Sequence, residues 1–457
     1  MYDIAIIGGG PGGYASALYA HNFGLSVALI EKGRVGGTCL LRGCIPAKAW
    51  IESAHVYSTV VDAEEFGVET SDPRFVWPTA LARKQKIVDL LVKGLTGTLN
   101  GRSVEIIEGH GRITGRGSVS IEGEDGSLSQ IQARAIILAT GSEPSSIPGY
   151  EVDGERIVSS DHALDWTEQP GSVAVVGGGV IGCEFASFLA EVGTDVHIFE
   201  MEDQLVPGME PEAAKILARA FRRRKIKMNL GVGVGPARMN DDSVTVPSGD
   251  DSVDVDVVLM AVGRRPVTAD AGLDAVGIAT EGGYIAVDPE TMQTATEGIY
   301  AVGDIVAGTP QLAHVAFAEA IAAVTHIATG ETAGVDYNAI PMVVYTHPEI
   351  GWVGQTEATA RSTGIDVETA EHGMRGVGRA IIQGDVGGTV KIVSQTDGPI
   401  MGATVVGPGA GELIHELMYS VGWEALPSEA ASFIHAHPTI AEAIGETLLA
   451  AAGRPLH

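Results

Sequence analysis

The stretch IAIIGGGPGGYASALYAHNFGLSVALIE, residues 4–31, predicts a complete unit of strand, turn, helix and strand. An apolar run precedes the glycine pattern, and a second apolar run ends at Glu31. Gly8 permits a tight turn, Gly10 lets the backbone approach a pyrophosphate at the helix N-terminus, and Gly13 allows the helix to pack closely. Glu31 can accept a hydrogen bond from a ribose hydroxyl. The stretch therefore predicts a dinucleotide site.

A second stretch, VAVVGGGVIGCEFASFLAEVGTDVHIFE at residues 173–200, repeats this unit. Glycine makes up 61 of the 457 residues, so about one match to G-x-G-x-x-G is expected by chance. Both matches nevertheless follow an apolar run and open a helical pattern, which chance does not supply. Gly177, Gly179 and Gly182 repeat the three glycine positions. Glu200 ends the second strand with no Arg in the next three residues, so NAD is expected rather than NADP.

Three more apolar runs predict buried strands that each end in a turn, at residues 135–141, 257–263 and 298–304. Pro144 follows the first run and marks a crossing between domains. From about Tyr337 the pattern changes to alternating strands mixed with amphipathic helices, and no glycine fingerprint recurs. The predicted fold class is therefore α/β, with two Rossmann-like dinucleotide-binding domains followed by a C-terminal α+β domain.

Two of the three cysteines, Cys39 and Cys44, follow the first unit closely. A cysteine pair at this spacing at the start of a helix can approach disulfide distance. The helix dipole and Lys48 would both stabilise a thiolate there. Two alternatives remain: a pair of core cysteines, and a metal site that lacks a second Cys/His pair to complete it. Cys183 is predicted to be a small buried hydrophobe.

A histidine near the C-terminus is a candidate base. Residues 434–442 read IHAHPTIAE. An enzyme that handles thiols needs a base with a pKa of about 6–7, which a histidine held by a carboxylate supplies. A histidine near a proline is by itself more often structural. Here Glu442 lies five residues after His437 with a proline-initiated turn between them, which favours a catalytic histidine.

The composition narrows the class of protein. There are 58 acidic and 29 basic residues, a net charge of -29, which argues against nucleic acid and anionic membranes as partners. The apolar runs fall short of the ~20 residues that span a bilayer, and the N-terminus has no basic start typical of a signal peptide. Three cysteines do not build a disulfide framework. We expect a cytoplasmic protein whose acidic balance serves solubility or a charged docking face.

These features together resemble the pyridine nucleotide-disulfide oxidoreductases over nearly the whole chain. Within that family, the branch that oxidises dihydrolipoamide is the most similar. The C-x4-C and H-x-H-P-T segments are the most specific signals. Besides the two fingerprints, the motifs that carry the resemblance are GGTCLLRGCIPAK at 36–48, ATG at 139–141, GRRP at 263–266, AVGD at 301–304, YTHPE at 345–349 and HAHPT at 435–439.

The resemblance implies domains, cofactors and the residues that hold them. It implies an FAD-binding domain with a redox disulfide over 1–149, an NAD-binding domain over 150–268, a central segment over 269–336 that completes the FAD site, and a dimerisation domain over 337–457. The residues it places at FAD are Gly8, Gly10, Gly13, Glu31, Lys48, Gly111, Thr140, Gly141, Ser142, Asp304 and Ala313, with Asp304 at the ribityl chain. The residues it places at NAD are Gly177, Gly179, Gly182, Glu200 and Gly263. No metal is expected.

The resemblance also implies thiol-disulfide exchange followed by flavin and nicotinamide chemistry. His437 from the other subunit, oriented by Glu442, would deprotonate a dihydrolipoyl thiol, and the resulting thiolate would attack Cys39. Cys44 would be left as a thiolate facing the flavin. The implied partners are a second copy of this chain, and the lipoyl domain and peripheral binding module of a dihydrolipoyl acyltransferase in a 2-oxoacid dehydrogenase complex.

Several positions bear on how far the resemblance extends. Lys48 and Glu184 match a lysine–glutamate pair beside the flavin in the family. Leu41 and Arg42 stand where Asn-Val is usual, which leaves the lining of the disulfide loop open. One alternative is another low-molecular-weight disulfide reductase of the mycothiol or glutathione type, but glutathione-type members usually have a Tyr at the position of Val180. The other is a non-catalytic docking subunit, against which the intact motifs argue.

Overall fold

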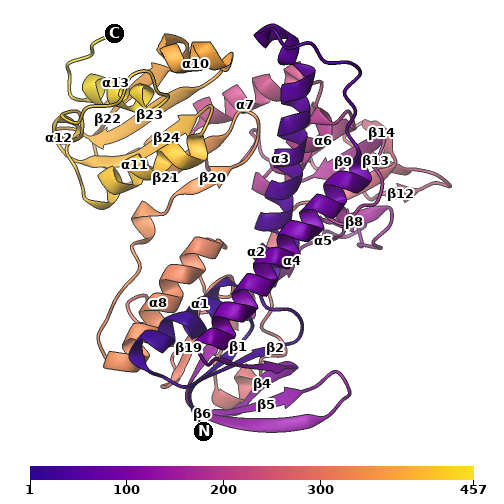
Figure 1. The fold of residues 1–457 in the computed structure, drawn as a ribbon, viewed down its shortest axis with the longest axis vertical. Coiled ribbons are helices and arrows are strands. Elements are labelled where there is room, and N and C mark those ends of the chain that lie inside the picture. The colour runs from indigo at the N-terminus through magenta and orange to yellow at the C-terminus, as the bar shows by residue number, and fades with distance from the viewer.

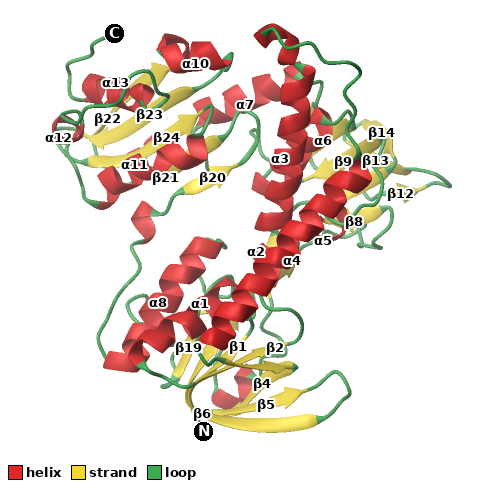
Figure 2. Cartoon of the chain, viewed as in Figure 1, coloured by secondary structure: helices red, strands yellow, loops and turns green.

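The computed structural model describes all 457 residues, which form three large β-sheets with helices packed around them (Figures 1 and 2). Figure 1 shows the N-terminal sheet at the bottom, the second sheet at the right and the C-terminal sheet at the upper left. None of the helices combines the length and apolarity needed to span a bilayer. The α/β class predicted from the sequence is confirmed, including its separate C-terminal domain.

The first sheet has the strand order β3-β2-β1-β6-β5-β4, and β19 pairs with β6. The pairs β3-β2, β2-β1, β1-β6 and β6-β19 are parallel, and β4, β5 and the first half of β6 form an antiparallel extension. Strand β19 follows the second unit in the sequence but pairs with β6, so the chain returns to the first sheet after that unit. The elements are β1 (Tyr2–Ile7), β2 (Val27–Glu31), β3 (Glu105–Glu108), β4 (His110–Gly115), β5 (Ser118–Glu122), β6 (Leu128–Leu138), β19 (Ile299–Ala301), α1 (Pro11–Ala20) and α8 (Ala313–Thr329).

The turn after β1 requires glycine for steric reasons. Gly8 has a φ of +105°, and a Cβ there would lie 2.2 Å from the carbonyl oxygen of Ala139. A Cβ at Gly13 would lie 1.8 Å from the carbonyl oxygen of Gly8. Both distances are too short for any side chain, so the glycines let β1, β6 and α1 meet closely.

The second sheet repeats this design. Its order is β11-β10-β9-β15-β8, all parallel, and a three-stranded antiparallel sheet of β12, β13 and β14 is attached. Gly177 has a φ of +109°, and a Cβ at Gly182 would lie 1.9 Å from the carbonyl oxygen of Gly177. The elements are β8 (Ile157–Ser159), α5 (Ser160–Ala163), β9 (Ser172–Val176), α6 (Val180–Glu191), β10 (Asp195–Glu200), α7 (Pro211–Arg223), β11 (Lys227–Leu230), β12 (Arg238–Met239), β13 (Val244–Ser248), β14 (Asp251–Val255) and β15 (Val257–Met260).

Three helices follow the first unit and join it to the second: α2 (Gly37–Arg42), α3 (Cys44–Val61) and α4 (Trp77–Gly101). Figure 1 shows α3 and α4 running from the first sheet toward the upper part of the molecule. Aromatic packing holds α3, α4 and α6 together, because the ring of Trp50 lies 4.4 Å from that of Trp77 and 6.2 Å from that of Phe188, centroid to centroid. These contacts bury Trp50 almost completely.

The C-terminal sheet has the order β20-β21-β24-β23-β22 and is antiparallel throughout. Helices α11 and α13 pack on it. This matches the alternating pattern of the sequence after Tyr337. The elements are β20 (Met342–Val344), β21 (Ile350–Gly354), α9 (Glu357–Ser362), β22 (Val367–Gly373), α10 (Gly378–Gln383), β23 (Thr389–Gln395), β24 (Ile400–Val406), α11 (Ala410–Gly422), α12 (Pro427–Ala430) and α13 (Glu442–Ala451).

Short elements complete the connections. The crossing predicted at Pro144 is a two-stranded antiparallel ribbon in which β7 pairs with β16. The remaining elements are β7 (Ser142–Pro144), β16 (Arg264–Pro266), β17 (Thr280–Glu281), β18 (Tyr284–Ile285) and single turns of 3₁₀ helix at His21–Phe23, Ala63–Phe66, Leu273–Val276, Tyr337–Ala339 and Met374–Gly376.

One buried cation ties the C-terminal domain to the second unit. Lys391 of β23 lies 2.9 Å from Glu210, just before α7, 2.9 Å from Glu357 of α9 and 3.4 Å from Glu212 of α7. Only 8% of the Lys391 side chain and 4% of the Glu210 side chain are exposed. Hydrogen bonds to the carboxylates raise the pKa of Lys391 despite its burial. The ammonium therefore stays charged and neutralises a carboxylate that would otherwise be buried alone.

We expect Lys391→Met to lower the free energy of unfolding by about 3–5 kcal/mol, because it leaves the Glu210 carboxylate buried without its cation. Urea denaturation measures this change. The matched control is Lys227→Met, since Lys227 forms an exposed pair with Asp195 at 2.9 Å and its loss should cost about 0–1 kcal/mol. Equal losses in the two variants would contradict this role for Lys391.

Candidate active site

Both glycine turns open into one large cavity. Its volume is about 2360 Å³, more than twice the upper end of the roughly 300–1,000 Å³ usual for a single small ligand. Most of the residues that the sequence singled out line it. These are Gly8, Gly10, Glu31, Cys39, Cys44, Lys48, Thr140, Gly141, Ser142, Gly177, Gly179, Glu184, Glu200, Gly263, Asp304 and Ala313.

Three of the proposed cofactor residues lie behind the cavity wall. Gly13 and Gly182 are in the first turns of α1 and α6, where the close approach of each helix to its strand excludes a side chain. Gly111 lies in β4, where a Cβ would contact Ile30 and Ile7 at 3.0 and 3.2 Å. These three glycines do not line the cavity, and they allow the segments that form its wall to pack closely.

Several other lining residues were not predicted from the sequence. Gly12, Lys32 and Thr38 line the cavity next to residues that were identified, and proximity to the motifs is the only signal that would have found them. Asp161 and Gln311 also line it, but they lie in segments without any motif, and only the tertiary fold brings them there.

The two turns fit the two dinucleotides that the resemblance implies. The backbone N–H of Gly9 donates to Glu31 Oε2 at 2.6 Å, and the N–H of Gly178 donates to Glu200 Oε2 at 2.6 Å. Helices α1 and α6 begin after Gly10 and Gly179 with no side chain capping their first turns. Their free N–H groups and helix dipoles therefore suit a pyrophosphate, and each carboxylate is held where a ribose would lie.

Asp304 sits where the returning segment meets the first sheet. Its Oδ2 accepts a hydrogen bond from Ser142 Oγ at 2.5 Å, and Arg264 Nε donates to the same hydroxyl at 2.7 Å. Arg264 Nη2 also lies 3.4 Å from Thr38 Oγ1, beside the cysteines. This network joins the GRRP and AVGD motifs to the redox segment, although they are far apart in the sequence.

Cys39 and Cys44 are free thiols on two successive helices. The spacing of the two cysteines predicted a pair at the start of one helix. The chain instead breaks at Gly43, where a Cβ would lie 2.9 Å from the carbonyl oxygen of Thr38. Cys44 becomes the first residue of α3, so its thiolate faces the positive end of that helix. Because of this break, Cys44 follows α2 closely in the sequence but lies at the N-terminus of a separate helix.

The two thiols differ in acidity. A hydrogen bond from Cys39, together with the charge of Lys48, lowers the pKa of Cys44 to about 7 against the effect of burial. The same hydrogen bond, followed by burial, raises the pKa of Cys39. At neutral pH the pair therefore holds one proton on Cys39 and a large fraction of thiolate on Cys44. Cys183 is fully buried, and burial raises its pKa, as expected for a core residue.

Lys48 and Glu184 form an ion pair beside the cysteines. Lys48 Nζ lies 2.7 and 2.9 Å from the two oxygens of Glu184. This ion pair joins α3 to α6. Glu184 also accepts a hydrogen bond from the backbone N–H of Tyr345 at 3.0 Å, and the ammonium lies 4.6 Å from the centre of the Tyr345 ring. Attraction to Glu184 raises the pKa of Lys48 although burial opposes it, so this residue remains a cation.

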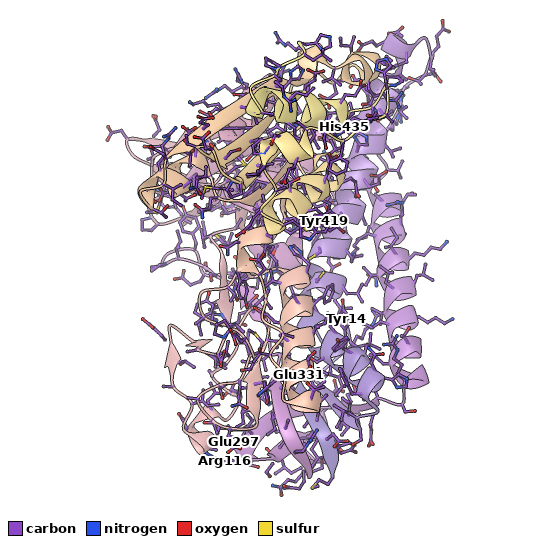
Figure 3. All side chains as sticks on the ribbon, turned by 90° about the vertical axis from the view of Figure 1, so that its left-hand side faces the viewer. Tyr14, Arg116, Glu297, Glu331, Tyr419 and His435 are labelled. Atoms are coloured by element: carbon purple, nitrogen blue, oxygen red, sulfur yellow. The ribbon has the colours of Figure 1, made fainter.

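His437 and Glu442 also form a pair, at 2.7 Å between Nδ1 and Oε1. The hydrogen bond lowers the pKa of Glu442. The His437 side chain is 77% exposed and does not line the cavity of its own chain. Just before it, Phe433 and Ile434 are 75% and 98% exposed. Figure 3 shows the neighbouring His435 in the upper, C-terminal part of the chain, above Tyr14 of α1.

Two family matches cover most of the chain. Residues 2–320 match the pyridine nucleotide-disulphide oxidoreductases, and residues 340–448 match the dimerisation domain of the same enzymes. The chain belongs to this family. It is therefore an NAD-dependent flavoprotein disulfide oxidoreductase whose cofactors are FAD and NAD, and its dimerisation domain indicates a homodimer.

Individual relatives are similar along their full length. The dihydrolipoyl dehydrogenase of Bacillus subtilis is 37% identical over 100% of this chain and 99% of its own. The mitochondrial dihydrolipoyl dehydrogenase 1 of Arabidopsis thaliana is 36% identical over 100% of this chain and 91% of its own. The crystal structure of LpdA from Mycobacterium tuberculosis superposes with a TM-score of 0.91 at 28% identity, over 97% of this chain and 98% of that one.

In this flavoprotein the thiolate of Cys44 is open to direct measurement. The Cys39→Ser variant cannot form the disulfide, and its Cys44 should give a thiolate absorbance beside the bound flavin that grows with pH around a midpoint below the usual thiol range, because the charge of Lys48 still favours the thiolate. Adding Lys48→Met should move the midpoint to higher pH, because the cation that stabilises the thiolate is lost. A visible-absorbance titration tests both. An unchanged midpoint without Lys48 would contradict the electrostatic role of the ion pair.

Proposed function

We propose that this enzyme oxidises dihydrolipoamide to lipoamide with NAD⁺ as the acceptor. The observation that carries the proposal is the arrangement of Cys39 and Cys44 beside Lys48 in the one cavity that both dinucleotide turns share. Full-length similarity to dihydrolipoyl dehydrogenases supports the choice of substrate.

The cofactor residues divide between the two turns. FAD would lie on Gly8, Gly10 and Glu31, with Thr140, Gly141, Ser142 and Asp304 completing its site. NAD would lie on Gly177, Gly179, Glu200 and Gly263, where the carboxylate of Glu200 favours a free 2′-hydroxyl over a 2′-phosphate. When bound, FAD supplies the two-electron chemistry that links the cysteine pair to the nicotinamide.

The chain's own residues perform the thiol-disulfide exchange. One dihydrolipoyl thiol loses its proton to His437 of the partner subunit, and the thiolate attacks Cys39 Sγ in the Cys39–Cys44 disulfide, which expels Cys44 as thiolate. The second substrate sulfur then attacks the first substrate sulfur in the mixed disulfide and gives its proton to Cys39 Sγ, the leaving group, so the bond to Cys39 breaks, lipoamide is released and Cys39 is left as a thiol. Of the two substrate protons, one remains on Cys39 and one leaves to water.

The exposure of His437 supports a site shared between subunits. A base that is 77% exposed and absent from the cavity of its own chain needs a second cavity to serve. Phe433 and Ile434 beside it are apolar and exposed, which suits burial against a second copy. Glu442 accepts from the Nδ1–H of His437, so that Nε2 is the free acceptor for a thiol proton.

We further propose that the enzyme serves a 2-oxoacid dehydrogenase complex in the cytoplasm. Its partners there would be the lipoyl domain and the peripheral binding module of a dihydrolipoyl acyltransferase. The net charge of -29 suits association with a basic module, because complementary charge steers the encounter. Within the chain, the proposed functional domains are 1–149 for FAD and the disulfide, 150–268 for NAD, 269–336 to complete the FAD site, and 337–457 for dimerisation.

Anaerobic titration with one equivalent of dihydrolipoamide tests the substrate. We expect the thiolate absorbance of Cys44 to appear beside the flavin, and NAD⁺ to discharge it. Cys44→Ser provides the control, because it removes the thiolate and should abolish the band. If the spectrum responds to NADH but stays unchanged with dihydrolipoamide, the cofactor assignment survives and the substrate assignment fails.

Replacing the base tests its role. His437→Gln should lower kcat by roughly 10²–10⁴, the usual contribution of a positioned general base, and should leave FAD binding unchanged because His437 is not among the residues proposed to hold FAD. Steady-state kinetics across pH give the measurement. His457→Gln, which removes an exposed histidine paired with Glu446 at 3.0 Å, is the matched control and should keep full activity.

A further inference from the structure

The C-terminal end of α7 touches the turn between β20 and β21 through one arginine. Arg224 caps α7, and its side chain is only 20% exposed. Helix α7 contacts β11 of the second unit and β24 of the C-terminal domain, so it lies at the junction of the two. Arg222 and Arg223, its neighbours in the chain, are exposed and form no ion pair. Arg224 therefore differs from them in what it contacts.

The guanidinium of Arg224 binds three groups at once. Nη1 donates to Glu191 Oε1 at 2.6 Å and to Ser187 Oγ at 3.0 Å, both on α6. Nη2 donates to the backbone carbonyl of His347, in the turn. The same Ser187 hydroxyl accepts from the backbone N–H of His347 at 3.2 Å. Arg224 thus binds the carbonyl of His347 directly, and it is connected to the N–H of His347 through the Ser187 hydroxyl.

The turn reaches the redox site two residues earlier. The backbone N–H of Tyr345 donates to Glu184 at 3.0 Å, and the Tyr345 ring lies against Lys48. Glu184 binds Lys48, and the Lys48 cation stabilises the thiolate of Cys44 while the Glu184 charge opposes it. Each hydrogen bond donated to Glu184 offsets part of that negative charge. A continuous series of contacts therefore runs from Arg224 to Cys44.

Holding this turn with Arg224 carries a cost, because burial removes hydration from its charged guanidinium. Desolvation lowers the pKa of Arg224, and Glu191 raises it again. A guanidinium suits the task because its planar fork can serve a carboxylate and a carbonyl together, which an ammonium does less well. The other titratable groups around the turn line a small cavity of about 330 Å³ beside it and are Lys48, Glu52, His55, Glu191, Tyr345, His347, Glu349 and Asp385.

We propose that Arg224 is a positioning residue that holds the turn of Tyr345 and His347 against α6, and through it sets how strongly Glu184 opposes Lys48 at the redox cysteines. The inference rests on the proposed function, in which Cys44 is the working thiolate. Losing Arg224 releases the turn, withdraws the Tyr345 N–H from Glu184 and leaves more negative charge facing Cys44.

The test uses the Cys39→Ser holoenzyme, in which the absorbance of the Cys44 thiolate beside the flavin is titrated against pH. Adding Arg224→Gln should lower the thiolate fraction at pH 7 about fivefold and move the midpoint to higher pH. Arg224→Lys should recover part of the loss. Arg223→Gln is the matched control, because it removes a cation from the adjacent position without touching the turn, and should change the fraction less than twofold.

Two results would overturn the proposal: an unchanged titration with Arg224→Gln, or an equal shift with Arg223→Gln, which would indicate a general charge effect. If Arg224→Gln fails to fold, Ser187→Ala removes the hydroxyl that Arg224 and His347 share and must move the midpoint in the same direction. No substrate enters this titration, so failure of dihydrolipoamide as a substrate would leave its outcome readable.

Discussion

The ion pair between Lys48 and Glu184 is the contact on which the site depends. It joins α3, which begins at the reactive Cys44, to α6, which begins at the second dinucleotide turn. A carboxylate as buried as that of Glu184 needs further hydrogen bonds to offset its loss of hydration, and Glu184 receives one from Tyr345. The pair therefore places a fixed cation beside the thiolate and aligns the two nucleotide halves of the cavity.

The two glycine turns constrain the same region in a different way. In each, the chain passes so close to a neighbouring carbonyl that no side chain fits, and a glutamate at the end of the next strand binds the turn at 2.6 Å. This repetition produces two similar helix N-termini without a side-chain cap, each of the kind that suits an anion. The sheets differ in their surroundings, since only the first receives a late strand, β19, that brings Asp304 to the cavity.

The cavity of one chain is chemically incomplete. It holds the thiols, the cation and both nucleotide turns, but its candidate base points away on an exposed segment. The dimerisation domain accounts for this arrangement, because a second copy of the chain would cover the exposed apolar side chains and place the histidine beside its own cavity. Lys391 matters here, since its pair with Glu210 fastens the C-terminal domain, which carries His437, to the second unit.

The sequence by itself determined both dinucleotide units, the cysteine pair, the histidine–glutamate pair and the mixed α/β class. These depend on contacts within about thirty residues, where periodicity and glycine placement act directly. It did not determine the break at Gly43, the helix α4 or the meeting of Ser142, Arg264 and Asp304. The ion pair of Lys48 with Glu184 was expected only by analogy with relatives. Only the tertiary structure decided these. The Ser142–Arg264–Asp304 network and the ion pair join segments more than a hundred residues apart, α4 depends on its packing against α3, and the break at Gly43 depends on a close approach to a carbonyl that local pattern does not encode.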